Sequence, residues 1–231
     1  MILNARGPAG TGGSSSDSAS TRRSTSSMKE TDRLRSLLAS RAVIRGRIQL
    51  SSGAESDYYF DCKRVMLSAD GAPLVGRAVF AAIQSLPAPP LAIGGLTHGA
   101  DPIIGSAMAA AAAAGVHLDG FYVRKEPKKH GTQKLIENAP TPDTPVVIVD
   151  DVVTKGGSVV QAIDGVENAG CRVVAVIVLV DRLEGGAAKI KARVPKAQYV
   201  PLYTLEDFLD VEEIRREWTR NCEQQSRAVS T

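Results

Sequence analysis

The segment from Val146 to Ser158 reads VVIVDDVVTKGGS and constrains the fold more than any other part of the chain. Its first four residues are apolar and β-branched, which is typical of a strand buried on both faces of a parallel sheet. We predict that this strand ends at two adjacent carboxylates, Asp150 and Asp151. Gly156 and Gly157 in the loop that follows can bring backbone N–H groups close to an anion, and the N-terminus of the next helix favours negative charge.

The two carboxylates (the diacid) and the loop match the two ends of a ribose 5′-phosphate: a cis-diol donates two hydrogen bonds, and the phosphate is a dianion. The alternative is an ordinary turn with two solvated aspartates, but adjacent carboxylates at a buried strand end repel each other unless a ligand or cation is present. The segment lacks both the Walker loop pattern and the three-glycine dinucleotide pattern. It resembles the phosphoribosyl-pyrophosphate (PRPP) loop of type I phosphoribosyltransferases.

Length and composition indicate one domain of ordinary size. The chain has 231 residues, 43% of them hydrophobic, and a formal net charge of +3. This charge gives no general case for binding nucleic acid or membranes, and no apolar run reaches the ~18 residues that cross a bilayer. Cys62, Cys171 and Cys222 show neither metal-ligand spacing nor a disulfide framework. We therefore expect a cytoplasmic protein.

The N-terminal segment differs in kind from the rest of the chain. Residues 1–27 are rich in Ser, Thr, Gly and Arg, a composition that cannot bury apolar area, so we predict disorder there. A transit peptide would look similar, but Met28-Lys29-Glu30 reads as a natural start, and we interpret 1–27 as an upstream extension or leader. Residues 28–220 are then expected to form a single domain, with 221–231 as a frayed tail.

Strand-like and helix-like segments alternate within that domain. Short apolar runs predict strands at 91–95, 120–123, 146–149, 172–180 and 198–202. Residues 44–60 read as extended, and periodicity predicts helices at 27–40, 72–85, 103–114, 158–168 and 205–220. This alternation predicts an α/β fold with a doubly wound, mostly parallel sheet.

Polar residues follow each predicted strand at the point where it ends. Thr97-His98, Arg124-Lys125, the diacid and Asp181-Arg182 each follow a different strand. The carboxyl ends of parallel strands meet at one edge of the sheet, where ligands of such folds bind. The sequence therefore predicts one polar site at this edge.

Residues 124–131 read RKEPKKHG and form an isolated basic cluster. A solvated loop is the ordinary interpretation of such a charge run. A nucleic-acid patch is a second one, although no aromatic platform accompanies it. A third is a closing lid whose cations bind pyrophosphate, stabilise the charge that develops on it and exclude water.

Three segments extend the resemblance to a narrower family. They are SGAESDYYF at 52–60, RKEPKKHG at 124–131 and DRLEG at 181–185, and each is similar to an element of the orotate phosphoribosyltransferase family. The order and spacing of these three segments and the PRPP loop match those of the family. The resemblance covers roughly residues 30–215. It implies a type I fold with a small hood, formed mainly by 28–65 and 196–220.

The resemblance also implies an activity. PRPP with Mg²⁺ and orotate would give orotidine 5′-monophosphate and pyrophosphate in pyrimidine biosynthesis. Mg²⁺ would be held mainly by PRPP, and a homodimer would share the basic loop across its interface. Transfer to another nucleobase and a PRPP-sensing regulator are the alternatives that we keep.

Particular residues inherit roles from the resemblance. The residues implied in catalysis are Arg124, Lys128, His130, Asp150 and Asp151. The residues implied in PRPP binding are these five together with Lys125, Val152, Val153, Thr154, Lys155, Gly156, Gly157, Ser158, Thr97 and His98. The residues implied in orotate binding are Thr154, Arg182, Tyr59 and Phe60, and core packing is the alternative for the aromatic pair.

The chain departs from the family pattern at two places. Ser51 and His98 stand where many members carry lysine, which removes fixed positive charge near the diphosphate. His98 is retained as a backbone contact, and Thr97–His98 is a candidate for the non-proline cis peptide that often occurs in this superfamily.

Overall fold

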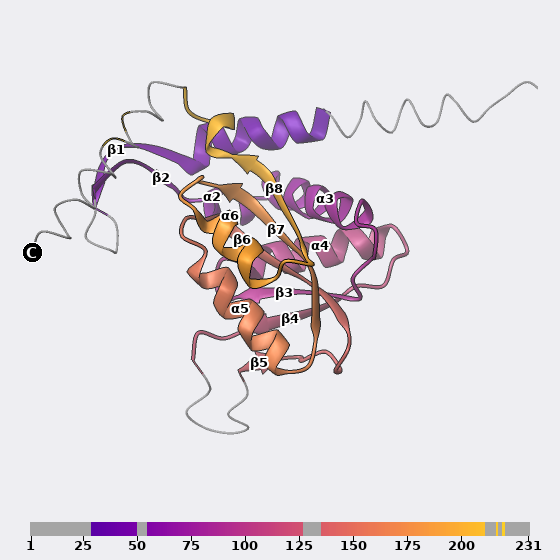
Figure 1. Ribbon diagram of the computed structural model, residues 1–231. Helices are drawn as coiled ribbons and strands as arrows, with labels where there is room; N and C mark the ends of the chain where they lie inside the picture. The colour runs from indigo at the N-terminus through magenta and orange to yellow at the C-terminus, as the bar shows by residue number, and fades with distance from the viewer. Residues whose placement is uncertain (1–28, 50–54, 127–134, 211–215, 217–218, 220–231) are drawn as a thin grey trace, which may run out of the picture.

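A mostly parallel sheet forms the centre of the protein in the computed structural model, which describes residues 29–49, 55–126, 135–210, 216 and 219 (Figure 1). Its six strands lie in the order β5-β4-β3-β6-β7-β8. Their bounds are β3 Ala92–Leu96, β4 Asp119–Val123, β5 Ile136–Glu137, β6 Pro145–Val153, β7 Arg172–Asp181 and β8 Gln198–Thr204. Only the β4–β5 pairing is antiparallel among these strands. The predicted α/β class is confirmed.

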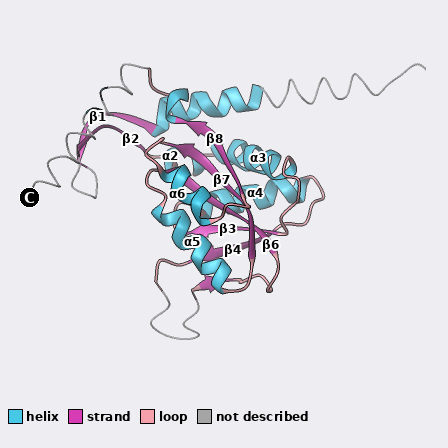
Figure 2. Ribbon diagram, in the orientation of Figure 1, coloured by secondary structure: helices cyan, strands magenta, loops and turns pink. Residues whose placement is uncertain are grey.

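Helices cover both faces of this sheet (Figure 2). Their bounds are α3 Gly71–Gln84, α4 Asp101–Ala113, α5 Gly157–Asn168 and α6 Gly186–Arg193. Val147 and Val149 of β6 belong to the core that contains α3 and α4, whereas Val146 and Ile148 belong to the core that contains α5 and α6. The β-branched run is therefore buried on both sides because successive side chains alternate between two helical layers.

The hood consists of N-terminal elements that pack against the end of β8. A helix at 29–37 continues into η1 Leu38–Ala42, and β1 Val43–Gln49 pairs antiparallel with β2 Glu55–Phe60, followed by the short α2 Lys63–Met66. Tyr203 donates to the carbonyl of Thr31 at 2.8 Å, and Arg45 donates to that of Phe208 at 3.3 Å. These contacts hold the hood to the last strand of the sheet.

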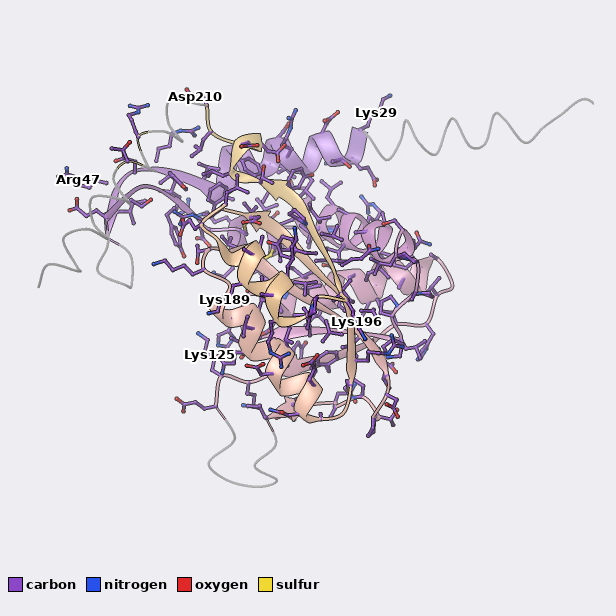
Figure 3. The ribbon with its side chains drawn as sticks, viewed as in Figure 1. Lys29, Arg47, Lys125, Lys189, Lys196 and Asp210 are labelled. Carbon is purple, nitrogen blue, oxygen red and sulfur yellow. The ribbon has the colours of Figure 1, made fainter. Side chains whose placement is uncertain are left out.

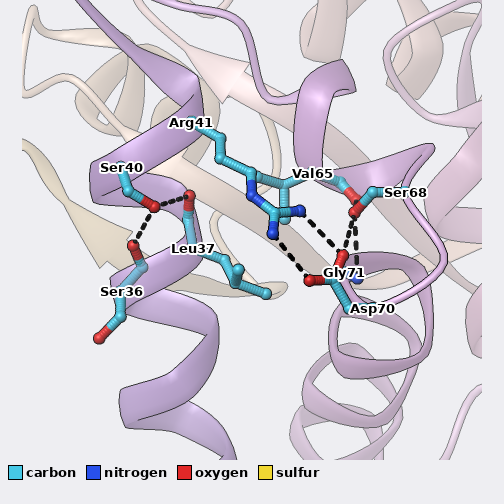
Figure 4. Close-up of polar contacts among 8 residues, drawn as sticks. All are labelled: Ser36, Leu37, Ser40, Arg41, Val65, Ser68, Asp70 and Gly71. Carbon is cyan, nitrogen blue, oxygen red and sulfur yellow. Dashed lines mark hydrogen bonds and ion pairs between the residues drawn. The ribbon is translucent and has the colours of Figure 1, made fainter.

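A bidentate ion pair also ties the hood to α3 (Figure 4). Both terminal nitrogens of Arg41 donate to the carboxylate of Asp70 at 2.9 Å. Ser68 donates to the same carboxylate at 2.9 Å. The hydrogen bonds from Arg41 and then Ser68 lower the pKa of Asp70 to about 2. The pair fixes the junction between η1 and the residue that precedes α3.

Several sequence predictions require correction. β6 does not end at the diacid: it pairs with β7 as far as Val153, so Asp150 and Asp151 lie inside the strand. β8 belongs to the main sheet, so residues 198–204 are not part of the hood. The helix predicted at 205–220 does not start at Leu205: residues 205–207 form a three-residue 3₁₀ turn, which a capping box between Thr204 and Asp207 begins. Of residues 211–220, the described positions 216 and 219 are helical.

Two glycines in the packed pair α3 and α4 predict opposite stability effects. A Cβ at Gly76 would collide with the backbone carbonyl of Ser106 in α4, whereas a Cβ at Gly105 would meet nothing within 4 Å. Gly76→Ala is expected to lower the free energy of unfolding by roughly 1–3 kcal/mol, because α4 must move. Gly105→Ala is expected to raise it by roughly 0.5–1 kcal/mol through helix propensity. Urea denaturation of both variants tests this, and effects of the same sign would contradict it.

Candidate active site

The diacid lies at the carboxyl end of the central strand β6. Asp150 is 7% exposed. The Asp151 backbone N–H donates to Asp150 Oδ1 at 3.1 Å, and the Val152 N–H donates to Asp151 Oδ1 at 2.9 Å. Burial, followed by the charge of Asp151, raises the pKa of Asp150 to about 7, and burial also raises the pKa of Asp151. Two acceptors held in this way are suited to a ligand that donates two hydrogen bonds.

The loop after β3 passes directly against these carboxylates. A Cβ at Gly99 would lie 2.6 Å from Oδ1 of both Asp150 and Asp151, so only glycine fits there without displacing the diacid. The peptide bond Thr97–His98, the candidate that the family resemblance suggested, is cis. The His98 side chain is 89% exposed, with Nδ1 3.5 Å from Asp101 Oδ2, so this loop offers backbone rather than the imidazole to the diacid.

The loop after β6 joins the diacid to α5. Gly156 adopts a left-handed conformation with φ of 71°, and α5 begins at Gly157, one residue earlier than predicted. The N–H of Gly186 donates to the carbonyl of Thr154 at 2.9 Å, which pins the loop to the start of α6. Residues 154–158 therefore bring a helix N-terminus beside the diacid, the arrangement expected for a phosphate.

Arg182 is a buried cation at the end of the neighbouring strand β7. It is 4% exposed, and its backbone N–H donates to the carbonyl of Val153 at 2.9 Å. Nη2 lies 2.8 Å from Glu184 Oε1, and the guanidinium lies 4.6 Å from the centre of the Tyr58 ring. Nε has no hydrogen-bond partner in the part of the chain that the structure describes. A buried guanidinium of this kind is suited to a planar anion.

The two aromatic residues of β2 that were predicted to bind orotate differ in their surroundings. Tyr59 is 37% exposed, whereas Phe60 is 4% exposed and packs edge-on against Tyr58 and Phe208. Consecutive residues of a strand point to opposite sides, so Phe60 lies in the core and Tyr59 points away from it. Tyr58, which the sequence prediction omitted, is the residue that covers Arg182. Side chains alternate along β2, so Tyr58 and Phe60 point to the same side of the strand. This alternation was the sequence signal that could have identified Tyr58.

The basic loop is described only at its start. Arg124 Nε donates to Glu137 on β5 at 2.8 Å, so β5 holds this arginine. Gln161 of α5 donates to the carbonyl of Lys125 at 2.8 Å, and Figure 3 shows Lys125 beside α5. Lys128 and His130 lie outside the described residues, as do Lys129 and Ser51.

Comparison with known proteins agrees with this geometry. Residues 75–200 match the family described as the phosphoribosyl transferase domain. An orotate phosphoribosyltransferase of Rhodopirellula baltica is 42% identical over 176 residues, which cover 74% of this chain and 90% of that protein. One from Streptomyces coelicolor is 45% identical over 151 residues, covering 65% and 82%. The chain belongs to the orotate phosphoribosyltransferase family.

Solved structures of the orotate phosphoribosyltransferase family have the same fold. The Mycobacterium tuberculosis enzyme in complex with PRPP is 32% identical, covers 78% of this chain and 98% of its own, and gives a TM-score of 0.65. The adenine phosphoribosyl transferase of Trypanosoma brucei, at 15% identity and a TM-score of 0.58, shares the fold alone.

Sequence reasoning missed further residues at this orotate phosphoribosyltransferase site. Gly99 had no role in the prediction, although the glycine after a strand is a signal for close backbone approach. Lys63 of the hood also lies beside the diacid, with its Nζ 3.9 Å from Asp151 Oδ2. No local pattern reveals this contact, because it joins segments far apart in the sequence.

Proposed function

We propose that this protein transfers the phosphoribosyl group of PRPP to orotate, giving orotidine 5′-monophosphate and pyrophosphate in pyrimidine biosynthesis. The observation that carries the proposal is the position of Arg182. A buried guanidinium with an unpartnered Nε lies at the end of β7, joined by a backbone hydrogen bond to the strand that carries the diacid. A phosphate loop and a site for a planar anion therefore share one edge of the sheet.

The proposed roles follow from the chemistry of each group. Asp150 and Asp151 accept hydrogen bonds from the ribose hydroxyls, and residues 154–158 hold the 5′-phosphate. Arg182 and Thr154 bind orotate, beside Tyr58. Cleavage of the C1–O bond leads, C1 gains oxocarbenium character, and N1 of orotate attacks from the opposite face. The chain acts by positioning and by neutralising the leaving group rather than through a nucleophile.

The basic loop completes the proposal as a lid over pyrophosphate. Arg124, Lys125, Lys128 and His130 would supply the charge, and the loop would reach the site of a second copy in a homodimer. Arg124 starts from a defined position, because Glu137 holds its Nε at 2.8 Å. We also propose a cytoplasmic location. Among the described residues, no helix is both long and apolar enough to cross a bilayer.

Mg²⁺ is proposed as the cofactor, bound mainly by PRPP oxygens. Among the described residues, no three His, Cys, Asp or Glu side chains cluster as a metal site. Mg²⁺ prefers phosphate oxygens and retains waters, and when bound it would neutralise the diphosphate.

A panel assay tests the substrate. Purified protein with PRPP and Mg²⁺ is supplied with orotate, adenine, hypoxanthine or uracil, and pyrophosphate release is followed. Orotate is expected to give turnover at least ~100-fold above the other bases, because only it presents a carboxylate to Arg182. Faster release with a purine would support the alternative nucleobase. PRPP binding without turnover of any base would support a regulator.

A further inference from the structure

In the hood, one lysine lies between two acidic side chains, and one of these belongs to the diacid. Lys63, the first residue of α2, has its Nζ 3.9 Å from Asp151 Oδ2 and 3.9 Å from Asp61 Oδ1. Asp61 follows β2 and Asp151 lies in β6, so the charge of Lys63 acts on one acidic group of the hood and on one of the central sheet. None of the roles assigned above uses this lysine.

The geometry of Lys63 is poor for a stabilising ion pair. Its side chain is 49% exposed, and both contacts are at the outer limit for a salt bridge. Pairs of this kind contribute about 0–1 kcal/mol to folding. Asp151 differs from Lys63 because its side chain is only 16% exposed, so water solvates its negative charge poorly. The effect of Lys63 therefore falls mainly on the protonation state of Asp151.

Several ionisable groups face the diacid from the elements packed around it. Cys62 and Lys63 face it from the hood, with Asp61 beside Lys63, and Lys125 faces it from the end of β4 and Tyr199 from β8. Burial raises the pKa of the Cys62 thiol well above its usual value, so this group stays neutral at physiological pH. Burial also raises the pKa of Tyr199, with a further contribution from its 2.7 Å hydrogen bond to Asp181. These two neighbours supply no charge.

The remaining cations divide between the two carboxylates. Lys63 opposes the effect of burial on Asp151, and it is the foremost influence that lowers the pKa of that group. Lys125 also lowers the pKa of Asp150, by less than the backbone N–H of Asp151 does. Each carboxylate of the diacid thus has its own lysine, one from the hood and one from the start of the basic loop.

We propose that Lys63 is a positioning residue that holds Asp151 in its ionised form, so that the diacid accepts both ribose hydroxyls of PRPP. The proposal rests on the proposed function only in naming PRPP as the ligand. Lys63 acts through Asp151 and touches no reacting atom. A carboxylate accepts hydrogen bonds from two donors at once, whereas a protonated carboxyl must itself donate one, so loss of this lysine weakens the site at neutral pH and not at high pH.

The neighbouring arginine provides a matched control. Arg64 belongs to the same short helix, carries the same charge and is 58% exposed, and its Nε lies 3.3 Å from Asp61 Oδ2. Comparing Lys63→Met with Arg64→Met separates an effect on Asp151 from a general loss of charge on α2. Lys63→Arg restores the charge at the original position.

The experiment measures kcat/KM for PRPP between pH 5.5 and 9 for the wild type and these three variants. Lys63→Met is expected to move the acid limb of the profile upward by roughly one pH unit, lowering kcat/KM about tenfold at pH 6.5 and little at pH 9. The KM for orotate is expected to stay within about twofold. Lys63→Arg and Arg64→Met are expected to follow the wild-type profile.

A second readout keeps the proposal separate from the substrate assignment. Calorimetric titration with PRPP and Mg²⁺ at pH 6.5 and 9 reports the same loss of affinity in Lys63→Met, even if orotate is not the acceptor base. A Lys63→Met profile that superimposes on the wild type would overturn the proposal. The same upward shift in Arg64→Met, or a loss in Lys63→Met that is equal at all pH values, would overturn it too.

Discussion

Asp150→Asn is expected to lower kcat/KM for PRPP by roughly 100-fold or more. Asparagine has the same shape but loses the charge and one acceptor oxygen, which weakens the hydrogen bonding that we propose between Asp150 and the ribose. Removing one electrostatic contact that strengthens as the reaction proceeds usually costs 10²–10³ in rate. Steady-state kinetics with varied PRPP measure the loss. Asp119→Asn is the control, because Asp119 is exposed and lies at the start of β4, at the edge of the sheet opposite to the diacid.

The same substitution is expected to make the ligand-free protein less sensitive to pH. The pKa of Asp150 is about 7 in the folded protein against 3.8 ordinarily. Between pH ~4 and ~7 the folded state keeps a proton that the unfolded state releases, so stability falls as pH rises through this window. Asparagine removes that fall. Thermal unfolding of both proteins at pH 5 and pH 8 tests the prediction.

The activity and the melting temperature of Asp150→Asn test two separate claims. Activity within a few-fold of the wild type would rule out the role of the diacid in PRPP binding. A variant whose melting temperature drops as much as that of the wild type between pH 5 and pH 8 would show that Asp150 is not the group that titrates. The expected result, lower activity with higher stability at pH 8, is typical of a site that binds ligand at the expense of folding.

Arg182→Lys is expected to raise the KM for orotate roughly 100-fold and to leave the affinity for PRPP within a few-fold. Lysine keeps the charge but lacks the planar fork that pairs with a carboxylate, and it cannot stack on Tyr58 at the observed 4.6 Å. A site built for a hydrogen-bonded anion discriminates by several powers of ten when that pairing fails. Kinetics with varied orotate and calorimetry with PRPP separate the two substrates.

Arg193→Lys is the matched control for this variant. Arg193 also contacts two acidic side chains, Asp164 at 2.8 Å and Glu167 at 2.7 Å, but it lies at the end of α6, away from the carboxyl edge of the sheet. We expect it to leave both substrates unaffected. A normal KM for orotate in Arg182→Lys, with the protein folded, would show that the carboxylate is recognised elsewhere.

The order of strands and helices could be read from sequence wherever burial was continuous. The apolar runs of β6 and β7 gave clear patterns because both faces of each strand are covered. β5 has only two residues, and α6 buries little beyond Gly186 and Ile190, so neither gives a periodic signal. The end of β6 was misplaced because the diacid looks like a strand terminus, although hydrogen bonds to β7 continue past it.

The residues of the candidate site also fall into those that could be found from sequence and those that could not. Segments that carry their chemistry in consecutive residues, such as the diacid and the loop ending at Ser158, were found from sequence. Contacts that depend on tertiary folding were not: Tyr58 over Arg182, Gly99 against the diacid, and Lys63 beside Asp151. In each of these the partners come from different elements, so spacing along the chain holds no trace of the pair.

The placement of the diacid inside β6 has a consequence for how the enzyme moves. β6 has β3 on one side and β7 on the other, and helices pack against both of its faces, so the two carboxylates belong to a strand that is enclosed on all sides. The closure proposed for the basic loop must then be a movement of that loop toward the diacid, because the strand that carries the diacid is packed on all sides. Substitutions that alter the rate of closure are accordingly expected outside the sheet, and those that alter sugar recognition within it.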